Sequence, residues 1–385
     1  MFERQIETRF LSTLERMGCG SLLLTLPGGR THSFAGPRQG PAAELTIHHP
    51  RAITAIAAKG DVGFAEAYRD GLLDSPDLAA LMTLALMNDD TLSRYIDGNS
   101  LVARLLHFLY RFQRNTPEGA RRNIHAHYDL GNAFYRLWLD PSMTYSSALF
   151  DQNDDLHSAQ LRKYDRILEQ LDRPSGRILE IGCGWGGFAE RALMRGDYGI
   201  KGLTLSTEQA DFARNRLGRG AEIALQDYRH ENGKFDHIVS IEMFEAVGEE
   251  FWPAYFAKLR QALSQSGRAV VQTITIDEPH FDSYRRSADM IRSFVFPGGM
   301  LPTPTRFCAE AERAGLRIED SFGFGQDYAR TLRDWLARFE DRLADVRALG
   351  FDEGFIRIWR AYLAACIASF STRRTDVVQF RMSHG

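Results

Sequence analysis

The stretch RILEIGCGWGG, residues 177–187, decides the fold of this chain. Its first five residues predict a buried strand, and the four glycines that follow lead into a predicted helix. Glycine lets a backbone turn tightly and approach a ligand, and the N-terminus of the next helix offers free N–H groups. The turn therefore predicts a site for a nucleotide-like ligand, although a tight strand-to-helix connection without a ligand also has this form.

The residues around the turn narrow the choice of ligand. The spacing is G-x-G-x-G-G rather than the G-x-G-x-x-G of dinucleotide folds, and no Lys-Ser or Lys-Thr follows as in a phosphate-binding loop. The acidic Glu180 before the glycines suits a ligand that carries positive charge. These features favour S-adenosylmethionine, which has an ammonium and a sulfonium group, as the cofactor.

Strands and helices alternate on both sides of this turn, as a doubly wound sheet requires. The predicted strands are residues 177–181, 200–205, 222–225, 237–241 and 268–276. The predicted helices are residues 158–171, 187–195, 207–217, 251–263 and 304–314. The fold class is therefore α/β, a doubly wound Rossmann-like sheet, with a helix-rich C-terminal extension over residues 332–370. With S-adenosylmethionine as the favoured cofactor, we expect this sheet to be of the class I methyltransferase type.

The N-terminal part lacks this alternation and has mostly helical patterns. Residues 52–68, 78–86 and 101–114 have the apolar spacing of amphipathic helices, and residues 45–47 form one short strand candidate. We expect a small helical domain over residues 1–120 that binds lipid or a partner, followed by the methyltransferase domain over residues 121–385. Residues 277–304 interrupt the alternation and are expected to be an insertion that recognises the substrate.

Composition excludes several classes of protein. The 385 residues are 44% hydrophobic and 25% charged, which is typical of a globular protein. The 47 Lys and Arg against 50 Asp and Glu argue against general attraction to nucleic acid. Four widely spaced cysteines indicate neither a disulfide framework nor a metal site, and the start MFERQIETRF is unlike a signal peptide. We expect a cytoplasmic protein without a membrane-spanning helix.

Polar residues at the ends of the next two strands are candidates for cofactor contacts. Ser206 and Gln209 form a capping box, so they either cap the helix at 207–217, or bind the ribose, or do both. Asp227 follows the third strand, where it is either a turn residue or an adenine contact.

Six motifs in this sequence resemble the cyclopropane-fatty-acyl-phospholipid synthase family, which methylates unsaturated acyl chains with S-adenosylmethionine. The motifs are HYDLGNAFYRLWLDPSMTYSS (127–147), LEIGCGWGGFAE (179–190), LTLSTEQ (203–209), QDYR (226–229), FDHIVSIEMFEAVG (235–248) and FVFPGGMLP (294–302). The resemblance covers about residues 123–340. Together with the glycine turn it implies a set of cofactor-binding residues: Tyr145, Ser146, Glu180, Gly182, Cys183, Gly184, Trp185, Gly186, Thr204, Ser206, Gln209, Asp227, Tyr228 and Arg229.

The resemblance also implies a catalytic site. Family members hold a bicarbonate ion beside the alkene with a cysteine, a glutamate, a histidine, an isoleucine and a tyrosine. In this chain the glutamate is Glu245, the isoleucine is Ile274 and the tyrosine is Tyr328. Ser147 stands at the position of the cysteine and Gln272 at that of the histidine. Serine and glutamine can still donate hydrogen bonds to bicarbonate, but glutamine never carries positive charge. Either bicarbonate binding is impaired and the product changes, or the two substitutions are a tolerated variant of ordinary synthase chemistry.

Other acidic and aromatic residues have two interpretations. Glu242 and Glu245 either belong to the catalytic site or lie on a solvated face. Tyr128, Phe134, Tyr135 and Trp138 are spaced to form either a packed core or a substrate tunnel.

The expected substrate is the acyl chain of a phospholipid at the inner face of the membrane. Apolar residues of the insertion are expected to line an acyl channel or face a membrane: Met290, Ile291, Phe294, Val295 and Phe296. Arg285, Arg286 and Arg292 are expected either to contact phosphate headgroups or to lie in solvent on an amphipathic helix. A homodimer is compatible with the sequence, as is a C-methyltransferase that makes a branched or unsaturated product, or an inactive lipid-binding homologue.

Overall fold

The computed structural model describes residues 2–96, 130–287 and 289–385, which form two compact units. The first unit holds the described residues of Met1–Phe112 together with Asp282–Pro297 and Leu343–Arg374. The second unit holds the remainder and contains the glycine turn. This division differs from two consecutive domains, because two later segments join the N-terminal unit. The break expected near residue 120 lies outside the described residues.

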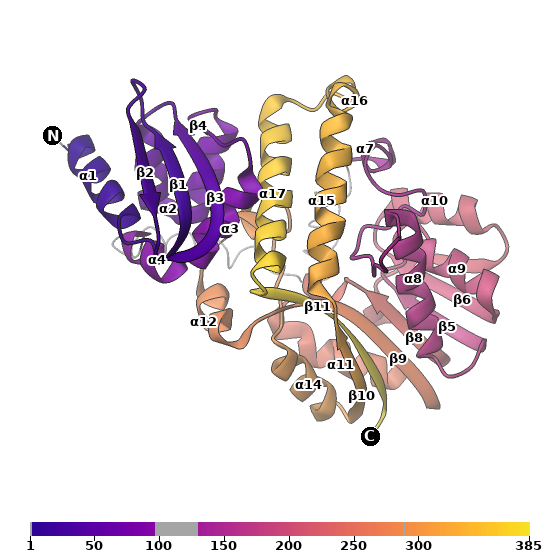
Figure 1. The fold of residues 1–385 in the computed structure, drawn as a ribbon. Coiled ribbons are helices and arrows are strands. Elements are labelled where there is room, and N and C mark those ends of the chain that lie inside the picture. The colour runs from indigo at the N-terminus through magenta and orange to yellow at the C-terminus, as the bar shows by residue number, and fades with distance from the viewer. Residues whose placement is uncertain (1, 97–129, 288) are drawn as a thin grey trace. The chain divides into compact units, whose positions relative to one another are not determined.

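The second unit is built on a seven-stranded sheet in the order β10-β11-β9-β8-β5-β6-β7 (Figure 1). Its strands are β5 (Ser175–Ile181), β6 (Asp197–Thr204), β7 (Ala221–Leu225), β8 (Phe235–Ile241), β9 (Leu263–Ile276), β10 (Leu316–Gly323) and β11 (Thr375–His384). Neighbouring strands are parallel from β7 to β9, and β11 is antiparallel to both β9 and β10. The predicted doubly wound α/β sheet is confirmed.

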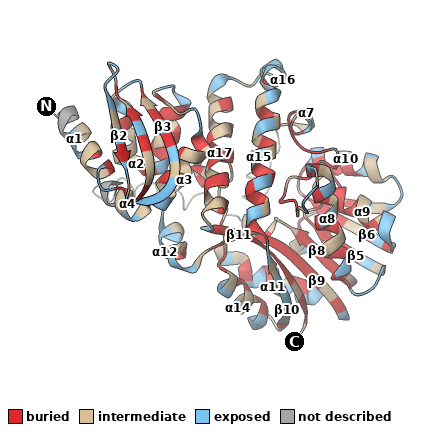
Figure 2. Ribbon diagram, in the orientation of Figure 1, coloured by how far each residue is buried: buried red, intermediate tan, exposed pale blue. Residues whose placement is uncertain are grey.

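In the described part of this unit, two helices precede β5, and the other helices follow strands of the sheet. The helices are α7 (Asn132–Arg136), α8 (Leu156–Glu169), α9 (Gly187–Arg195), α10 (Thr207–Leu217), α11 (Trp252–Ala262), α14 (Pro304–Arg313) and α15 (Gly325–Asp341). Because helices cover the sheet, its central strands are buried, and Ile178, Leu179 and Ile181 of β5 have at most 2% of their surface exposed (Figure 2).

The strand order positions a crevice for a ligand. The chain leaves β5 toward β6 and β7 on one side and then returns to β8 on the other side of β5. Parallel doubly wound sheets bind ligands outside the carboxyl ends of their strands, at such a reversal. The glycine turn after β5 lies at this point.

The sequence predicted a small helical domain for the first unit, but the unit is not purely helical. It contains a four-stranded sheet in the order β2-β1-β3-β4, of which only part of β3 was predicted. The strands are β1 (Cys19–Thr25), β2 (Thr31–Ala35), β3 (Arg38–Ile47) and β4 (Leu73–Asp74), and the helices are α1 (Phe2–Leu14), α2 (Arg51–Arg69), α3 (Leu78–Met87), α4 (Asp89–Ile96), α13 (Met290–Phe294), α16 (Leu343–Ala348) and α17 (Glu353–Ser371). The helix expected at residues 101–114 lies outside the described residues.

The insertion contains two helices rather than one. Helix α12 (Glu278–Arg286) spans the boundary between the units, and α13 packs its buried Met290 into the core of the first unit. Arg292 is buried, and its guanidinium binds the Asp289 carboxylate and the backbone carbonyl of Tyr284. The expected contact of Arg292 with a phosphate headgroup is therefore wrong.

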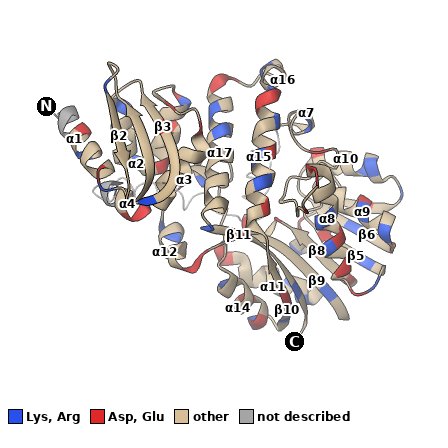
Figure 3. Ribbon diagram, viewed as in Figure 1, with Lys and Arg blue, Asp and Glu red and all other residues tan. Residues whose placement is uncertain are grey.

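Surface charge follows the near-neutral composition. Acidic and basic residues are interspersed along the helices of both units (Figure 3). Within the three described ranges, no helix is both long and apolar enough to cross a membrane.

Candidate active site

A pocket opens at the carboxyl ends of β5, β6 and β8. Most of the predicted cofactor residues line it: Tyr145, Ser146, Glu180, Gly182, Cys183, Gly184, Trp185, Thr204, Gln209, Asp227, Tyr228 and Arg229. Gly186 and Ser206 are the two predicted residues that do not. Gly186 is the N-cap of α9, and Ser206 is the N-cap of α10, where its hydroxyl accepts a hydrogen bond from the Gln209 amide at 3.3 Å.

The glycine turn leaves room for a ligand. Gly184 has φ of 50°, a left-handed conformation that costs other residues about 1–2 kcal/mol. A Cβ atom added to Gly184 would meet no atom within 4 Å, so the residue borders open space in the pocket. Behind the turn, the amides of Gly182 and Cys183 both donate to the Leu203 carbonyl at 2.9 Å, which ties the turn to β6.

Two carboxylates flank this space. Burial raises the pKa of Glu180 well above its usual value, and Lys163 opposes that shift. Among the described residues, Glu180 Oε2 has no hydrogen-bond partner. Asp227 lies at the far end, where burial raises its pKa but the stronger combined effect of Arg229 leaves it lowered; the guanidinium donates to Asp227 Oδ2 at 2.6 Å. The turn interpretation of Asp227 holds, because its side chain caps the short helix at Tyr228–His230.

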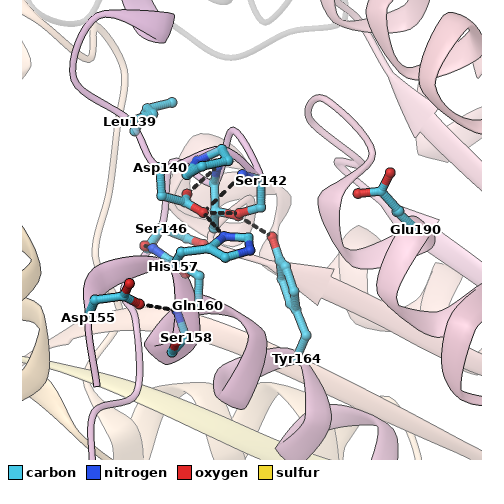
Figure 4. A network of polar contacts seen from close by, with 12 residues as sticks. Leu139, Asp140, Ser142, Ser146, Asp155, His157, Ser158, Gln160, Tyr164 and Glu190 are labelled. Carbon is cyan, nitrogen blue, oxygen red and sulfur yellow. Dashed lines mark hydrogen bonds and ion pairs between the residues drawn. The ribbon is translucent and has the colours of Figure 1, made fainter. Parts of the chain in front are cut away.

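The loop before α8 is fixed by Asp140, a residue that the sequence analysis missed (Figure 4). One oxygen of Asp140 accepts hydrogen bonds from the Ser142 hydroxyl at 2.6 Å and from His157 at 2.8 Å, and the other accepts from the Thr144 amide at 3.2 Å. The Thr144 hydroxyl in turn bonds to that of Tyr164 at 2.7 Å. This network holds the segment that carries Tyr145, Ser146 and Ser147. Its signal in the sequence is the run of Asp, Ser and Thr, which typically form local turns.

Lys163 is the second residue that the sequence analysis missed. It is fully buried on α8, and its Nζ atom donates to the Ser146 hydroxyl at 2.6 Å. Burial lowers the pKa of Lys163 to about 7, while the carboxylates of Glu242, Asp140 and Glu180 act in the opposite direction. Near neutral pH the Lys163 amine can therefore be either protonated or neutral.

Glu242, rather than Glu245, is the centre of the expected catalytic cluster. Its Oε1 atom accepts hydrogen bonds from the Ser147 amide at 2.9 Å and from the Gln272 side chain at 2.7 Å. Its Oε2 atom accepts a hydrogen bond from the Tyr328 hydroxyl at 2.6 Å. The structure therefore joins Ser147, Gln272 and Tyr328 through Glu242, a residue that the resemblance did not assign to the bicarbonate site. The interpretation of Glu242 as a solvated surface acid is also wrong.

Glu242 has an unusual backbone. Its φ of 49° lies in the left-handed region, where a non-glycine residue costs about 1–2 kcal/mol. The strain is held in place by the hydrogen bond from the Glu242 amide to the Gln272 carbonyl, at 2.8 Å. Strain of this kind persists where the surrounding structure imposes it, and it is concentrated at functional sites.

Glu245 forms a neighbouring cluster with the end of β9. Its Oε1 atom accepts hydrogen bonds from the Thr273 hydroxyl at 2.9 Å and from the Ile274 amide. Its Oε2 atom is buried and has no partner among the described residues. Burial, and secondarily the negative charge of Glu242, raises the pKa of Glu245 from 4.5 to about 8. At neutral pH Glu245 is therefore mostly protonated. Burial also raises the pKa of Glu242, and this shift is opposed by the charge of Lys163 and by the hydrogen bond from Tyr328.

The raised pKa of Glu245 predicts that the difference in thermal stability between the protein and its Glu245→Gln variant depends on pH. Because folding raises the pKa of Glu245, the folded state holds a proton that the unfolded state releases between about pH 4.5 and pH 8. The stability that Glu245 contributes is full below that range and is lost as the pH rises through it. Glutamine does not titrate, so the melting temperature of the parent relative to Glu245→Gln should fall from pH 5 to about pH 8. Thermal unfolding across this range measures it, with the exposed Glu312→Gln as control, and parallel profiles for parent and Glu245→Gln would contradict the assignment.

The aromatic residues before α8 belong to the packed core rather than to a substrate tunnel. Phe134, Tyr135 and Trp138 have 0% of their surface exposed, and Tyr135 packs against Trp185 with ring centroids 5.0 Å apart. This contact couples the core to the glycine turn. Tyr128 lies outside the described residues. Among the residues described, no group of His, Cys, Asp or Glu is arranged to hold a metal ion.

Known proteins are similar to this chain in sequence and in fold. A family model described as Mycolic acid cyclopropane synthetase matches residues 115–380. The chain is 38% identical to Tuberculostearic acid methyltransferase UfaA1 of Mycobacterium tuberculosis, over 94% of this chain and 87% of that one. It is 32% identical to cyclopropane-fatty-acyl-phospholipid synthase of Escherichia coli K12, over 89% of this chain and 88% of that one. The chain belongs to the mycolic acid cyclopropane synthetase family.

A solved structure of this family agrees. The mycolic acid cyclopropane synthase CmaA1, complexed with SAH and CTAB, superposes with a TM-score of 0.64 at 31% identity, over 68% of this chain and 97% of that one. Coclaurine N-methyltransferase superposes with a TM-score of 0.65 at 17% identity, which is a likeness of fold alone. As a mycolic acid cyclopropane synthetase family member, the chain is an S-adenosylmethionine-dependent methyltransferase.

The pocket residues fit this cofactor. The open space at Gly184 admits a ligand against the backbone, and the unpartnered oxygen of Glu180 is an acceptor for a positively charged group. Gly184, Glu180 and Asp227 would hold the cofactor, which supplies an electrophilic methyl group when bound.

Proposed function

We propose that this enzyme methylates a double bond in the acyl chains of phospholipids through a carbocation that then loses a proton. An alkene carbon is uncharged, so adding a methyl group to it leaves positive charge on the neighbouring carbon. A product forms only when a base removes a proton from that cation.

The observation that carries the proposal is the carboxylate cluster at the edge of the cofactor pocket. Glu242 lines the pocket and accepts three hydrogen bonds, and the Tyr328 ring beside it offers an electron-rich face. A carboxylate next to a phenol ring suits a reaction that passes through a cation. A methyltransferase for amines or alcohols needs a base for its nucleophile but no group that stabilises a carbocation.

Similarity to named relatives supports a lipid substrate. The relatives quoted above are named for tuberculostearic acid and for the fatty acyl chains of phospholipids. The pocket also has apolar lining residues beyond the glycine turn: Met143, Ile181, Leu203, Leu205, Ile241, Met243 and Val247. We propose that the enzyme docks on the inner face of the membrane, from which an acyl chain can reach the site.

Two products are compatible with this reaction. Closure of the cation gives a cyclopropane, whereas formation of a new double bond gives a methylene branch. The second candidate is the branched product. It is supported by Ser147 and Gln272, which stand at the positions where the family usually has cysteine and histidine. An inactive lipid-binding homologue would have no reason to keep the strained Glu242 and its three donors.

The lipids of a bacterial host that expresses the protein provide the test. We expect the phospholipid acyl chains with a double bond to gain one CH₂ unit by mass spectrometry, and fragmentation will distinguish a ring from a branch. A host that expresses Gly184→Val to the same level is the matched control. Unchanged lipids in the presence of folded, cofactor-binding protein would contradict the proposed function.

A further inference from the structure

We propose that Glu242 is the base of the reaction and occupies the position at which this family was expected to hold bicarbonate. The inference rests on the proposed function, because it concerns the proton that the carbocation loses. It assigns a catalytic role to a residue that the resemblance did not include, and it makes the enzyme independent of bicarbonate.

The hydrogen-bond donors that bicarbonate would need are already used. Of the residues expected to hold the ion, Ser147, Gln272 and Tyr328 all donate to Glu242, at 2.6–2.9 Å. The amide of Ile274 donates to Glu245. The Ser147 hydroxyl donates to the Ala148 carbonyl at 2.9 Å. Every group that the resemblance assigned to the ion as a donor thus serves a carboxylate or carbonyl of the chain itself.

Charge also disfavours the ion. Bicarbonate would have to lie beside the Glu242 carboxylate, and two like charges in a buried site repel each other strongly. Gln272 replaces the histidine that would have been able to carry compensating positive charge. The residues present therefore do not fit bicarbonate, and a side-chain carboxylate takes over its set of donors.

A chain of amides fixes this arrangement. The side-chain NH₂ group of Gln170 donates to Gln379 Oε1 at 3.1 Å, and the side-chain NH₂ group of Gln379 donates to Gln272 Oε1 at 3.0 Å. With its oxygen occupied, the Gln272 side chain directs its NH₂ group at Glu242. Gln272 and Gln379 have 0% of their surface exposed, so the orientation is held by buried partners. Glutamine at position 272 is thus a positioning residue for a carboxylate.

The backbone of Glu242 supports the same assignment. A φ of 49° is one that glycine adopts readily, so the carboxylate stands on a turn that favours a residue without a side chain. A glycine there would leave the three donors facing a space of carboxylate size, which is what an external anion requires. The difference between an internal and an external base then reduces to one side chain.

The proton transfer balances as follows. A C–H bond of the new methyl group breaks, and the hydrogen leaves as a proton to a Glu242 carboxylate oxygen. The two electrons of that bond form the third bond of a cyclopropane, or, after a hydride has moved between the two former alkene carbons, a carbon–carbon double bond. The cation and the carboxylate are both neutralised, and no oxidant or reductant is needed.

Two substitutions of Glu242 separate an internal base from an external one. Glu242→Gly removes the carboxylate, relieves the backbone strain and opens the anion position, whereas Glu242→Gln removes the charge but fills the space. We expect both variants to lose about 10²–10⁴-fold in turnover on phospholipid vesicles in buffer free of carbon dioxide. Added bicarbonate or formate should restore Glu242→Gly by at least about 10-fold and leave Glu242→Gln and the parent unchanged.

Binding provides a readout that does not depend on turnover. The resonance of carbon-13 bicarbonate should broaden in the presence of Glu242→Gly but not of the parent or Glu242→Gln. Calorimetry should show that all three proteins still bind S-adenosylmethionine, and Glu312→Gln serves as a surface control. The inference is overturned if the parent loses activity without bicarbonate. It is also overturned if Glu242→Gln keeps more than a tenth of the parent turnover, or if Glu242→Gly binds the cofactor but neither anion restores its activity. If the parent modifies no lipid in any buffer, the proposed function itself fails.

Discussion

Gly184→Val should abolish S-adenosylmethionine binding, and with it all product formation. Gly184 has φ of 50°, so valine at this position would be strained by about 1–2 kcal/mol. The larger effect is steric, because the space that the valine side chain would enter is open pocket that the cofactor needs. Isothermal titration calorimetry with the purified protein measures the loss directly.

Gly218→Val is the matched control for this experiment. Gly218 ends α10 with φ of 56°, and a Cβ atom there also meets nothing within 4 Å, but the residue does not line the pocket. The control also places a valine at a positive φ and should bind the cofactor as the parent does. Binding of similar strength to Gly184→Val would mean that the cofactor lies elsewhere.

The methyltransferase sheet was predictable because its signals are local. Helices α9 and α10 begin and end where the sequence predicted, since Gly187–Arg195 and Thr207–Leu217 are each bounded by a glycine or a serine cap. The strands β5, β6 and β8 are runs of seven or eight residues with buried apolar side chains, and they lie between such helices. Local pattern and tertiary structure agree here, so the fold class followed from the sequence.

Strands of the first unit and of the C-terminus were missed for a physical reason. β2 and β3 contain many exposed residues, and β3 includes Gly40 and Pro41, which are uncommon in strands. β11 gains its stability from pairing with β9 and β10, more than 50 residues away in the chain. Such pairing is invisible to a local pattern.

The hydrogen-bonding role of Glu242 was not predicted, because backbone conformation decides where its side chain points. Glu242 and Glu245 are three residues apart and would share one face of a helix. The short helix that includes Glu245 begins only at Phe244, and Glu242 precedes it with positive φ, so the two side chains reach different partners. A positive φ at glutamate has no signal in the sequence. Lys163 was missed for a similar reason, since a lysine on an amphipathic helix is usually in solvent.

The fate of a labelled methyl group tests the central claim most directly. Purified protein would be incubated with vesicles of a phospholipid that has one cis double bond per acyl chain and with S-adenosylmethionine whose methyl group carries three deuterium atoms. If Glu242 removes a proton from the transferred methyl group, that group loses one of its three deuterium atoms to the solvent. Mass spectrometry of the acyl chain should therefore find a gain of CD₂, whether the product is a ring or a methylene branch. A chain that retains all three deuterium atoms, or that gains no label, would contradict the account.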